Sequence, residues 1–396
     1  MNYHIFATNS KSLIFSKNKN KVVIAFAFLQ MLIIIFLGDS LAGYPIFKYL
    51  IGAGRFDDFY NTVGRAPYLP DIKDSYIVSP ALIFLFRFAS LNYVNLAFAF
   101  YNIVCISIAY FAFRRLKINP LIALALLVSY PMLFAISRGN AELLVFGIVL
   151  FGVSYLVAGK LNLAVVLMLA AATIKPTSLI FLALFPIGYL LKKWALLGLF
   201  FLGNLLVFYL INTDIFQFIE SYFIMLDNYK GAYVLGTGGD LFNNSLYGLA
   251  KTGVYYFFKD IPGRWDLIGM VADWYGLMSK VILIACILCV QLSMRFSSIE
   301  KIWILAASVI FFPAVSADYR LLYLLIPLAL ILIKENCTKI DNILFYGTLI
   351  ILIPKHFVLL DVQVGGAITL QSVVNPVIFS GLLYMLLANI KKAPQQ

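Results

Sequence analysis

Long apolar runs dominate the chain, and short polar interruptions separate them. Runs of this kind are typical of transmembrane helices, because about 20 residues cross the hydrocarbon core of a bilayer. We expect an all-α polytopic membrane protein with roughly twelve transmembrane helices, several of them shorter than a straight span needs. The expected spans are 22–38, 93–113, 120–136, 141–158, 161–174, 178–191, 195–211, 270–294, 302–315, 319–333, 340–353 and 373–390.

The segments between these runs predict one integral membrane domain, 1–396, in three parts. An N-terminal bundle, 22–211, contains a first outer loop at 39–92. Within that loop the apolar stretch 80–91 is short and carries Arg87, so it suits a helix lying in the outer interface. A long outer segment, 212–269, precedes the C-terminal helices, 270–396.

Composition excludes a soluble protein, because 63% of the residues are hydrophobic, only 12% are charged and the mean hydropathy is +0.94. The net charge of +12 does not indicate nucleic-acid binding, since the basic residues are scattered in short loops. Basic clusters at 114–117, 192–193, 295–301, 334–339 and 391–392 fall on one side of the predicted topology. The positive-inside rule makes that side cytoplasmic and places both termini there.

No cofactor or metal site is expected from the sequence. Cys105, Cys286 and Cys289 lie within apolar runs, and the two histidines have no second nearby ligand. The chain has no phosphate-binding or dinucleotide-binding glycine loop and no soluble nucleotide-binding domain.

Four polar interruptions fall on the face opposite the basic clusters. Each has an ordinary structural explanation: Asn140 can cap the following helix, Lys175 can reach the headgroups, and Asp318 can pair with Arg320. Their convergence on one face is less ordinary. The interruptions are Asp57-Asp58, the stretch 138–142, Lys175-Pro176 and Asp318-Tyr319-Arg320.

Together these residues supply carboxylates and three cations at the outer membrane surface. A hydroxyl becomes a good nucleophile when a positioned carboxylate takes its proton. A lipid-linked phosphate becomes a good leaving group when Lys or Arg stabilises its growing charge. The pattern therefore favours transfer of a group from a lipid phosphate to a hydroxyl.

The chain resembles the polyprenol-phosphate-mannose-dependent α-mannosyltransferases, membrane glycosyltransferases of the GT-C class. The order and spacing of several short motifs carry this resemblance over most of the chain. The motifs are Asp58-Phe59-Tyr60, Gly64-Arg65-Ala66, Ser79-Pro80, Arg138-Gly139-Asn140, Lys175-Pro176, Asn244-Ser245-Leu246 with Gly248, and 316–320 before Pro327. The chain departs from the family's aromatic and histidine pattern near the tenth span, where it has Ala317-Asp318-Tyr319-Arg320.

The resemblance implies inverting transfer of mannose or a related hexose from a polyprenyl-phosphate donor to a glycan or glycolipid hydroxyl. Asp58 or Asp57 is the expected general base, and Arg138, Lys175 and Arg320 are the expected phosphate ligands. Further substrate contacts are expected at Tyr60, Asn140, Glu142, Asn244, Ser245, Asp318 and Tyr319. The expected location is a bacterial plasma membrane, with the site on its periplasmic side.

Three alternatives remain open from the sequence. Asn243-Asn244-Ser245 also has the pattern of an N-glycosylation acceptor, or could simply cap a loop. The whole protein could be a flippase or transporter for lipid-linked glycans, although no inverted repeat is visible. It could also be a polysaccharide polymerase or ligase that uses a diphosphate donor.

Overall fold

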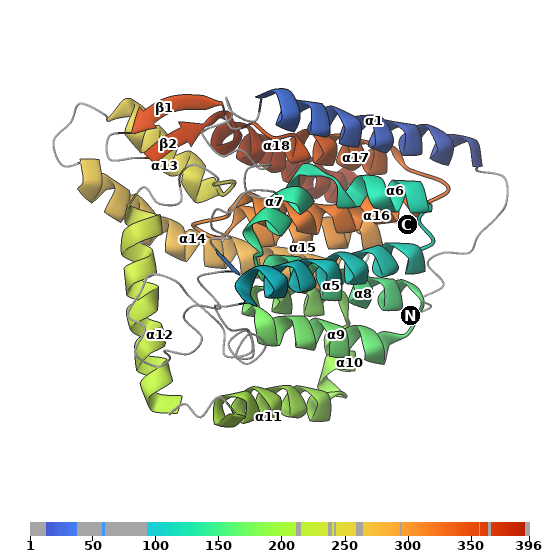
Figure 1. Cartoon of the computed structure of the whole chain (residues 1–396), viewed down its shortest axis with the longest axis horizontal. Coiled ribbons are helices and arrows are strands. Elements are labelled where there is room, and N and C mark those ends of the chain that lie inside the picture. Colours follow the sequence, from blue (N-terminus) through green and yellow to red (C-terminus); the bar gives the residue numbers. More distant parts are fainter. Residues whose placement is uncertain are drawn as a thin grey trace.

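The computed structural model describes residues 13–37, 58–59, 93–210, 215–236, 240, 243–258, 264–293, 295–355, 357–362 and 366–392. This part of the chain is mostly helical (Figure 1). Four of its helices are long and apolar enough to cross a membrane, and a fifth span results if the bent pair α6 and α7 is counted as one. The four are α1 (Leu13–Leu37), α5 (Val94–Arg115), α14 (Arg264–Leu292) and α18 (Leu370–Lys392).

Shorter apolar helices follow the remaining predicted runs within a few residues. Two of them begin at capping boxes: Ser297 with Glu300 starts α15, and Thr338 with Asp341 starts α17. These shorter helices are α8 (Glu142–Val157), α9 (Leu161–Ile174), α11 (Trp194–Leu210), α15 (Ser298–Phe311), α16 (Leu325–Ile333) and α17 (Lys339–Leu352).

Three predicted spans are not continuous α-helices. The run 120–136 divides into α6 (Pro120–Leu127) and α7 (Tyr130–Arg138), bent by 56°, with Pro131 in the first turn of α7. The run 178–191 becomes a 3₁₀ helix, η3 (Pro176–Leu184), and a short α10 (Ile187–Leu191) after Pro186. Proline explains both breaks, because it lacks the N–H that a helix interior requires. The run 319–333 begins as a 3₁₀ turn, η5 (Asp318–Leu324), before α16.

The predicted outer segment contains α12 (Ile215–Tyr229), a π-helical turn η4 (Lys230–Leu235) and α13 (Leu246–Phe257). Figure 1 shows α12 running across the direction of the bundle helices. A feature absent from the sequence prediction lies beside α13: an antiparallel hairpin of β1 (Val358–Val362) and β2 (Gly366–Thr369). The predicted interfacial helix at 80–91 lies outside the described residues.

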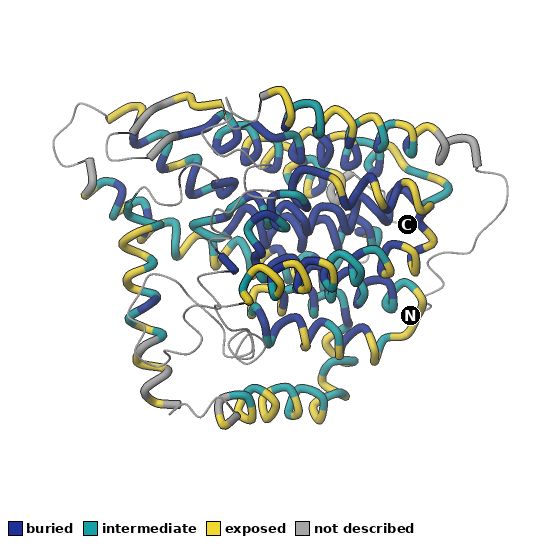
Figure 2. The backbone as a smooth tube through the Cα atoms, viewed as in Figure 1, coloured by how far each residue is buried: buried dark blue, intermediate teal, exposed yellow. Residues whose placement is uncertain are grey.

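The centre of the bundle is buried (Figure 2), and α8, α15 and α16 contribute many of its core residues. Trp303, on α15, is completely buried there. By contrast, α5, α11 and α14 expose rows of large apolar side chains, Leu96, Phe100, Leu199, Leu202 and Ile284 among them. Exposed apolar faces on membrane-type helices are suited to contact with lipid.

Candidate functional site

Two residues at the end of α7, Arg138 and Asn140, hold the carboxylate of Asp58. Arg138 donates from Nε to Asp58 Oδ2 over 2.9 Å and from Nη2 to Oδ1 over 3.0 Å. Asn140 donates from Nδ2 to Asp58 Oδ2 over 2.8 Å. Burial alone would raise the pKa of Asp58, but the charge of Arg138 and the hydrogen bonds from Arg138 and Asn140 outweigh burial and lower it. Asp58 is therefore an ionised, fully engaged carboxylate at neutral pH.

Local structure brings Asp58 to this position. Gly139 ends α7 with φ of 60°, a left-handed conformation that favours glycine. A Cβ at this position would lie 2.6 Å from the Cβ of Phe59. Phe59 is completely buried and packs against Phe98 and Tyr101 of α5, with 5.5 Å between ring centroids in each pair. Glycine at 139 thus lets the segment that carries Asp58 lie directly against the turn.

The side-chain amide of Asn140 joins the acid to the cations. Its Oδ1 accepts from the backbone N of Glu142 over 2.9 Å and from Lys175 Nζ over 3.2 Å. Because the oxygen has these donors, the nitrogen must face Asp58. The predicted capping by Asn140 is met only in its hydrogen bond: Asn140 Oδ1 accepts from the first residue of α8, whereas Ala141 occupies the N-cap position.

Glu142 is the common partner of the other two cations. Its Oε1 lies 3.2 Å from Lys175 Nζ and 3.5 Å from Arg320 Nε, and Tyr323 donates to its Oε2 over 2.5 Å. The side chain of Glu142 is completely buried. The possible pairing of Asp318 with Arg320 is not found in the described part of the chain, where Arg320 pairs with Glu142 instead.

Arg320 has unused hydrogen-bonding capacity. Its Nε and Nη1 are buried, and neither has a hydrogen-bond partner among the described residues. The nearby Lys175 ammonium lies 5.5 Å from the centre of the Tyr319 ring, which in turn stacks on Phe134. Buried guanidinium donors without acceptors are costly, so an anionic ligand at this position would satisfy them.

Asp318 belongs to a second, separate buried network. Its carboxylate accepts hydrogen bonds from Tyr130, from Gln371 and, over 2.8 Å, from Asn244. Asn375 then donates to Asn244 over 2.7 Å. These partners occupy the Asp318 carboxylate inside the protein. The geometry therefore favours a role for Asp318 and Asn244 in positioning the η5 turn, and not the substrate contact expected for them.

The network continues to Lys355, between α17 and β1. Lys355 Nζ donates to Asn375 Oδ1 over 2.9 Å and to the carbonyls of Ile351 and Ile353 at the end of α17. Sequence reasoning missed Tyr130, Gln371, Asn375 and Lys355. One signal was available: Gln371 and Asn375 are polar residues four apart within an apolar helix, a pattern that marks an internal polar face.

The Asn243-Asn244-Ser245 turn caps helix α13. Ser245 accepts from the N of Gly248 over 2.9 Å, and Asn243 Oδ1 accepts from the N of Ser245 and of Ser316. Asn243 is 1% exposed, and its amide nitrogen donates to Ala314. This geometry favours the capping interpretation over the glycosylation alternative, because the buried amide has no room for a glycan.

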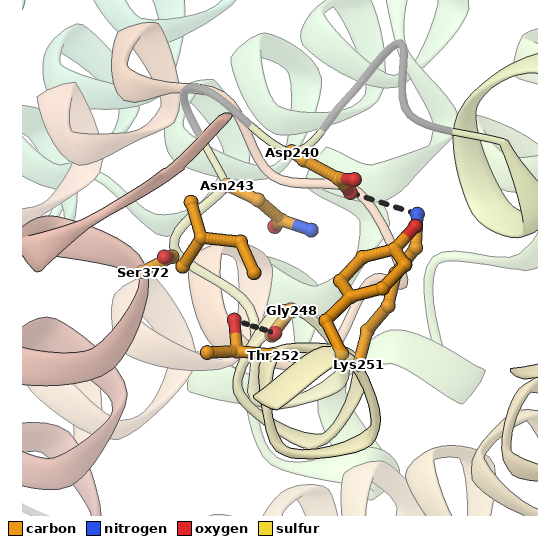
Figure 3. Close-up of a pocket in the computed structure, with 8 residues that line it drawn as sticks. Asp240, Asn243, Gly248, Lys251, Thr252 and Ser372 are labelled. Carbon is orange, nitrogen blue, oxygen red and sulfur yellow. Dashed lines mark hydrogen bonds and ion pairs between the residues drawn. The ribbon is translucent and has the colours of Figure 1, made fainter. Parts of the chain in front are cut away.

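A recess between α13 and the start of α18 contains a buried ion pair (Figure 3). Lys251 Nζ lies 2.7 Å from Asp240 Oδ1 and also donates to the carbonyl of Gly236. The lining side chains leave no room for a water molecule. The pair therefore attaches Asp240, which follows η4, to α13.

The structure thus brings seven of the predicted site residues into one cluster: Asp58, Arg138, Asn140, Glu142, Lys175, Tyr319 and Arg320. Asp57 and Tyr60, the other predicted base and a predicted substrate contact, lie outside the described residues. Among the residues that are described, no group of three or more His, Cys, Asp or Glu side chains is placed to hold a metal ion.

Comparison with family models, curated proteins and solved structures finds no match to this chain.

Proposed function

We propose that the protein is an integral membrane glycosyltransferase of the GT-C type, which transfers a hexose from a polyprenyl phosphate. Asp58 takes the proton of an acceptor hydroxyl on a glycan or glycolipid. The hydroxyl oxygen bonds to the anomeric carbon as the bond from that carbon to the phosphate oxygen breaks, so the configuration inverts. The observation that carries the proposal is the joining of two carboxylates and three cations, from distant chain segments, in a single cluster.

The charge of the cluster supports a lipid monophosphate donor. Arg138, Lys175 and Arg320 are opposed by two carboxylates, Asp58 and Glu142, so the cluster carries one excess positive charge among the described residues. A sugar phosphodiester carries one negative charge and balances it. When the phosphate leaves as a dianion, Asp58 has gained a proton, so the balance holds through the reaction. A diphosphate donor would bring one negative charge more than the excess positive charge of the cluster.

The direction of the helices supports an outer-face site. In three segments, the end at the site and the end with the other basic residues are opposite ends. Helix α5 has its site end near Phe98 and its basic end at Arg114-Arg115, and α9 has its basic end at Lys160 and its site end at Lys175. The segment from η5 to α16 has its site end near Arg320 and its basic end at Lys334. Under the positive-inside rule the basic ends are cytoplasmic. The site then faces the periplasm of a bacterial plasma membrane, in a bundle of roughly twelve full, short and broken spans with both termini inside.

The resemblance to polyprenol-phosphate-mannose-dependent mannosyltransferases makes mannose the first sugar to test. The experiment uses the purified full chain in lipid nanodiscs, with radiolabelled sugars on polyprenyl monophosphate, on polyprenyl diphosphate and on nucleotides. A lipid and glycan extract serves as the acceptor. We expect a radiolabelled product from a monophosphate donor only. Transfer from a diphosphate donor alone would favour a polymerase or ligase, and lipid movement in vesicles without product would favour a flippase.

A further inference from the structure

The hydrogen bonds of the site hold Asp58 in a form that is poor at accepting a proton. Arg138 occupies both carboxylate oxygens, and Asn140 shares Oδ2. A carboxylate beside an arginine loses basicity, because the positive charge favours its ionised form. A general base needs the opposite, a pKa nearer to the working pH. The arrangement therefore needs a step that releases Asp58 before transfer.

Arg138 is the more accessible member of the pair that it forms with Asp58. The Arg138 side chain is 23% exposed, whereas that of Asp58 is 9% exposed. Arg138 is the last residue of α7, so its side chain extends from a helix end. A phosphodiester offers two non-bridging oxygens, which match a guanidinium as well as a carboxylate does. Exchange of Asp58 for phosphate therefore replaces one bidentate pair with another.

The cluster would keep Asp58 in place after this exchange. Asn140 cannot follow Arg138, because Glu142 N and Lys175 hold its Oδ1 and its Nδ2 then faces Asp58. Phe59, the next residue, remains anchored against Phe98 and Tyr101. Asp58 would thus retain its orientation and lose only its strongest cation.

We propose that the donor phosphate takes Arg138 away from Asp58, so that the base is released only when the donor is bound. The inference rests on the proposed function, because it requires a lipid phosphate at Lys175 and Arg320. Arg138 is then a gating residue for the base as well as a ligand of the phosphate. The acceptor hydroxyl meets a competent carboxylate only in the donor complex.

Labelling with dicyclohexylcarbodiimide tests the exchange without measuring transfer. The reagent adds to protonated carboxyl groups, so an arginine-bound Asp58 should react slowly. Charged and titratable groups around Asp58 are Arg138, Lys175 and Tyr319 in the described part of the chain. In the purified full chain, saturating polyprenyl phosphate should speed labelling of Asp58 about tenfold, since losing an adjacent opposite charge shifts a carboxyl pKa by about one unit or more. Peptide mass spectrometry, with Asp58→Asn as the blank, assigns the modified residue.

Two controls accompany the labelling test. Asp341, which pairs with Lys334 over 2.6 Å at the start of α17, should show no response to polyprenyl phosphate. Arg138→Gln should label quickly without polyprenyl phosphate and gain nothing from it, and Arg138→Lys covers the case in which the glutamine variant fails to fold. If polyprenyl phosphate binds and the labelling of Asp58 is unchanged or slower, the exchange of Asp58 for phosphate at Arg138 is overturned, but the proposed function is not. Failure of polyprenyl phosphate to bind, measured by native mass spectrometry, overturns the proposed function as well.

Discussion

The amide nitrogen of Asn140 lies 2.8 Å from the carboxylate of Asp58 and fixes its direction relative to the cations. Asn140→Ala removes this hydrogen bond and the link to Lys175, so we expect transfer to fall about 10- to 100-fold, the cost of a small misplacement of catalytic groups. Initial rates at saturating donor measure the effect. Asn162→Ala is the matched control, because Asn162 is hydrogen-bonded to Tyr189 at the far end of α9. An unchanged rate in Asn140→Ala would remove Asn140 from the account.

Glu142 balances two cations, so its charge matters more than its shape. Glu142→Gln leaves Lys175 and Arg320 without their buried counterion, and losing one partner of a buried pair costs about 3–5 kcal/mol. We expect a lower thermal unfolding midpoint that polyprenyl phosphate partly restores, because the lipid phosphate replaces the missing negative charge. Glu220→Gln, on an exposed position of α12, is the control. A midpoint equal to the wild type, with no response to the lipid, would show that Glu142 does not hold the cations.

Asp318 is expected to act through the η5 turn and not on substrate. Asp318→Asn weakens the hydrogen bonds from Tyr130, Asn244 and Gln371, and a buried donor left unsatisfied costs about 1–3 kcal/mol. The unfolding midpoint should fall clearly. Tyr319→Phe, which keeps the ring over Lys175, should leave the midpoint near that of the wild type. A large rise in the donor KM of Asp318→Asn at unchanged stability would point to direct substrate contact instead.

The pKa of Lys355 predicts how the stability of the fold changes with pH. Burial lowers the pKa of Lys355 to about 7, although Asp318 acts in the opposite direction. Between about pH 7 and its ordinary value of about 10.4, the unfolded chain binds more protons than the folded chain, so the free energy of unfolding rises with pH across this window. Lys355→Met should flatten that slope in thermal unfolding measured from pH 7 to 9.5. An equal slope in both proteins would contradict the assignment.

The sequence predicted most helices of the bundle because their apolar runs are long and their ends carry charge. The predicted run 161–174 coincides with α9, and 340–353 is within one residue of α17 at each end. Pro131 and Pro186 are visible in the sequence. Whether a proline breaks a predicted span depends, however, on whether the neighbouring segments can pack against a bent helix. The β1–β2 hairpin was missed, although Gly365-Gly366 between short strand-like runs is a local hairpin signal.

The candidate site was predictable in its residue types and not in its pairings. Asp318 and Arg320 are neighbours in sequence, yet in a 3₁₀ turn with three residues per turn they lie on different sides of the helix. Arg320 therefore reaches Glu142 of α8, and Asp318 reaches Asn244 and Gln371. Such long-range partners follow from tertiary packing. Sequence spacing carries no information about them.

The proposed proton transfer to Asp58 is the central step of the account, and the rate of sugar transfer by Asp58→Asn tests it most directly. The variant is compared with wild type and with Asp57→Asn in nanodiscs, at saturating polyprenyl-phosphate sugar and with polyprenyl phosphate binding checked in parallel. The account predicts that Asp58→Asn binds the lipid phosphate and loses about 10²- to 10⁴-fold in rate, the usual contribution of a general base. A variant that binds the lipid and transfers sugar at the wild-type rate would contradict it.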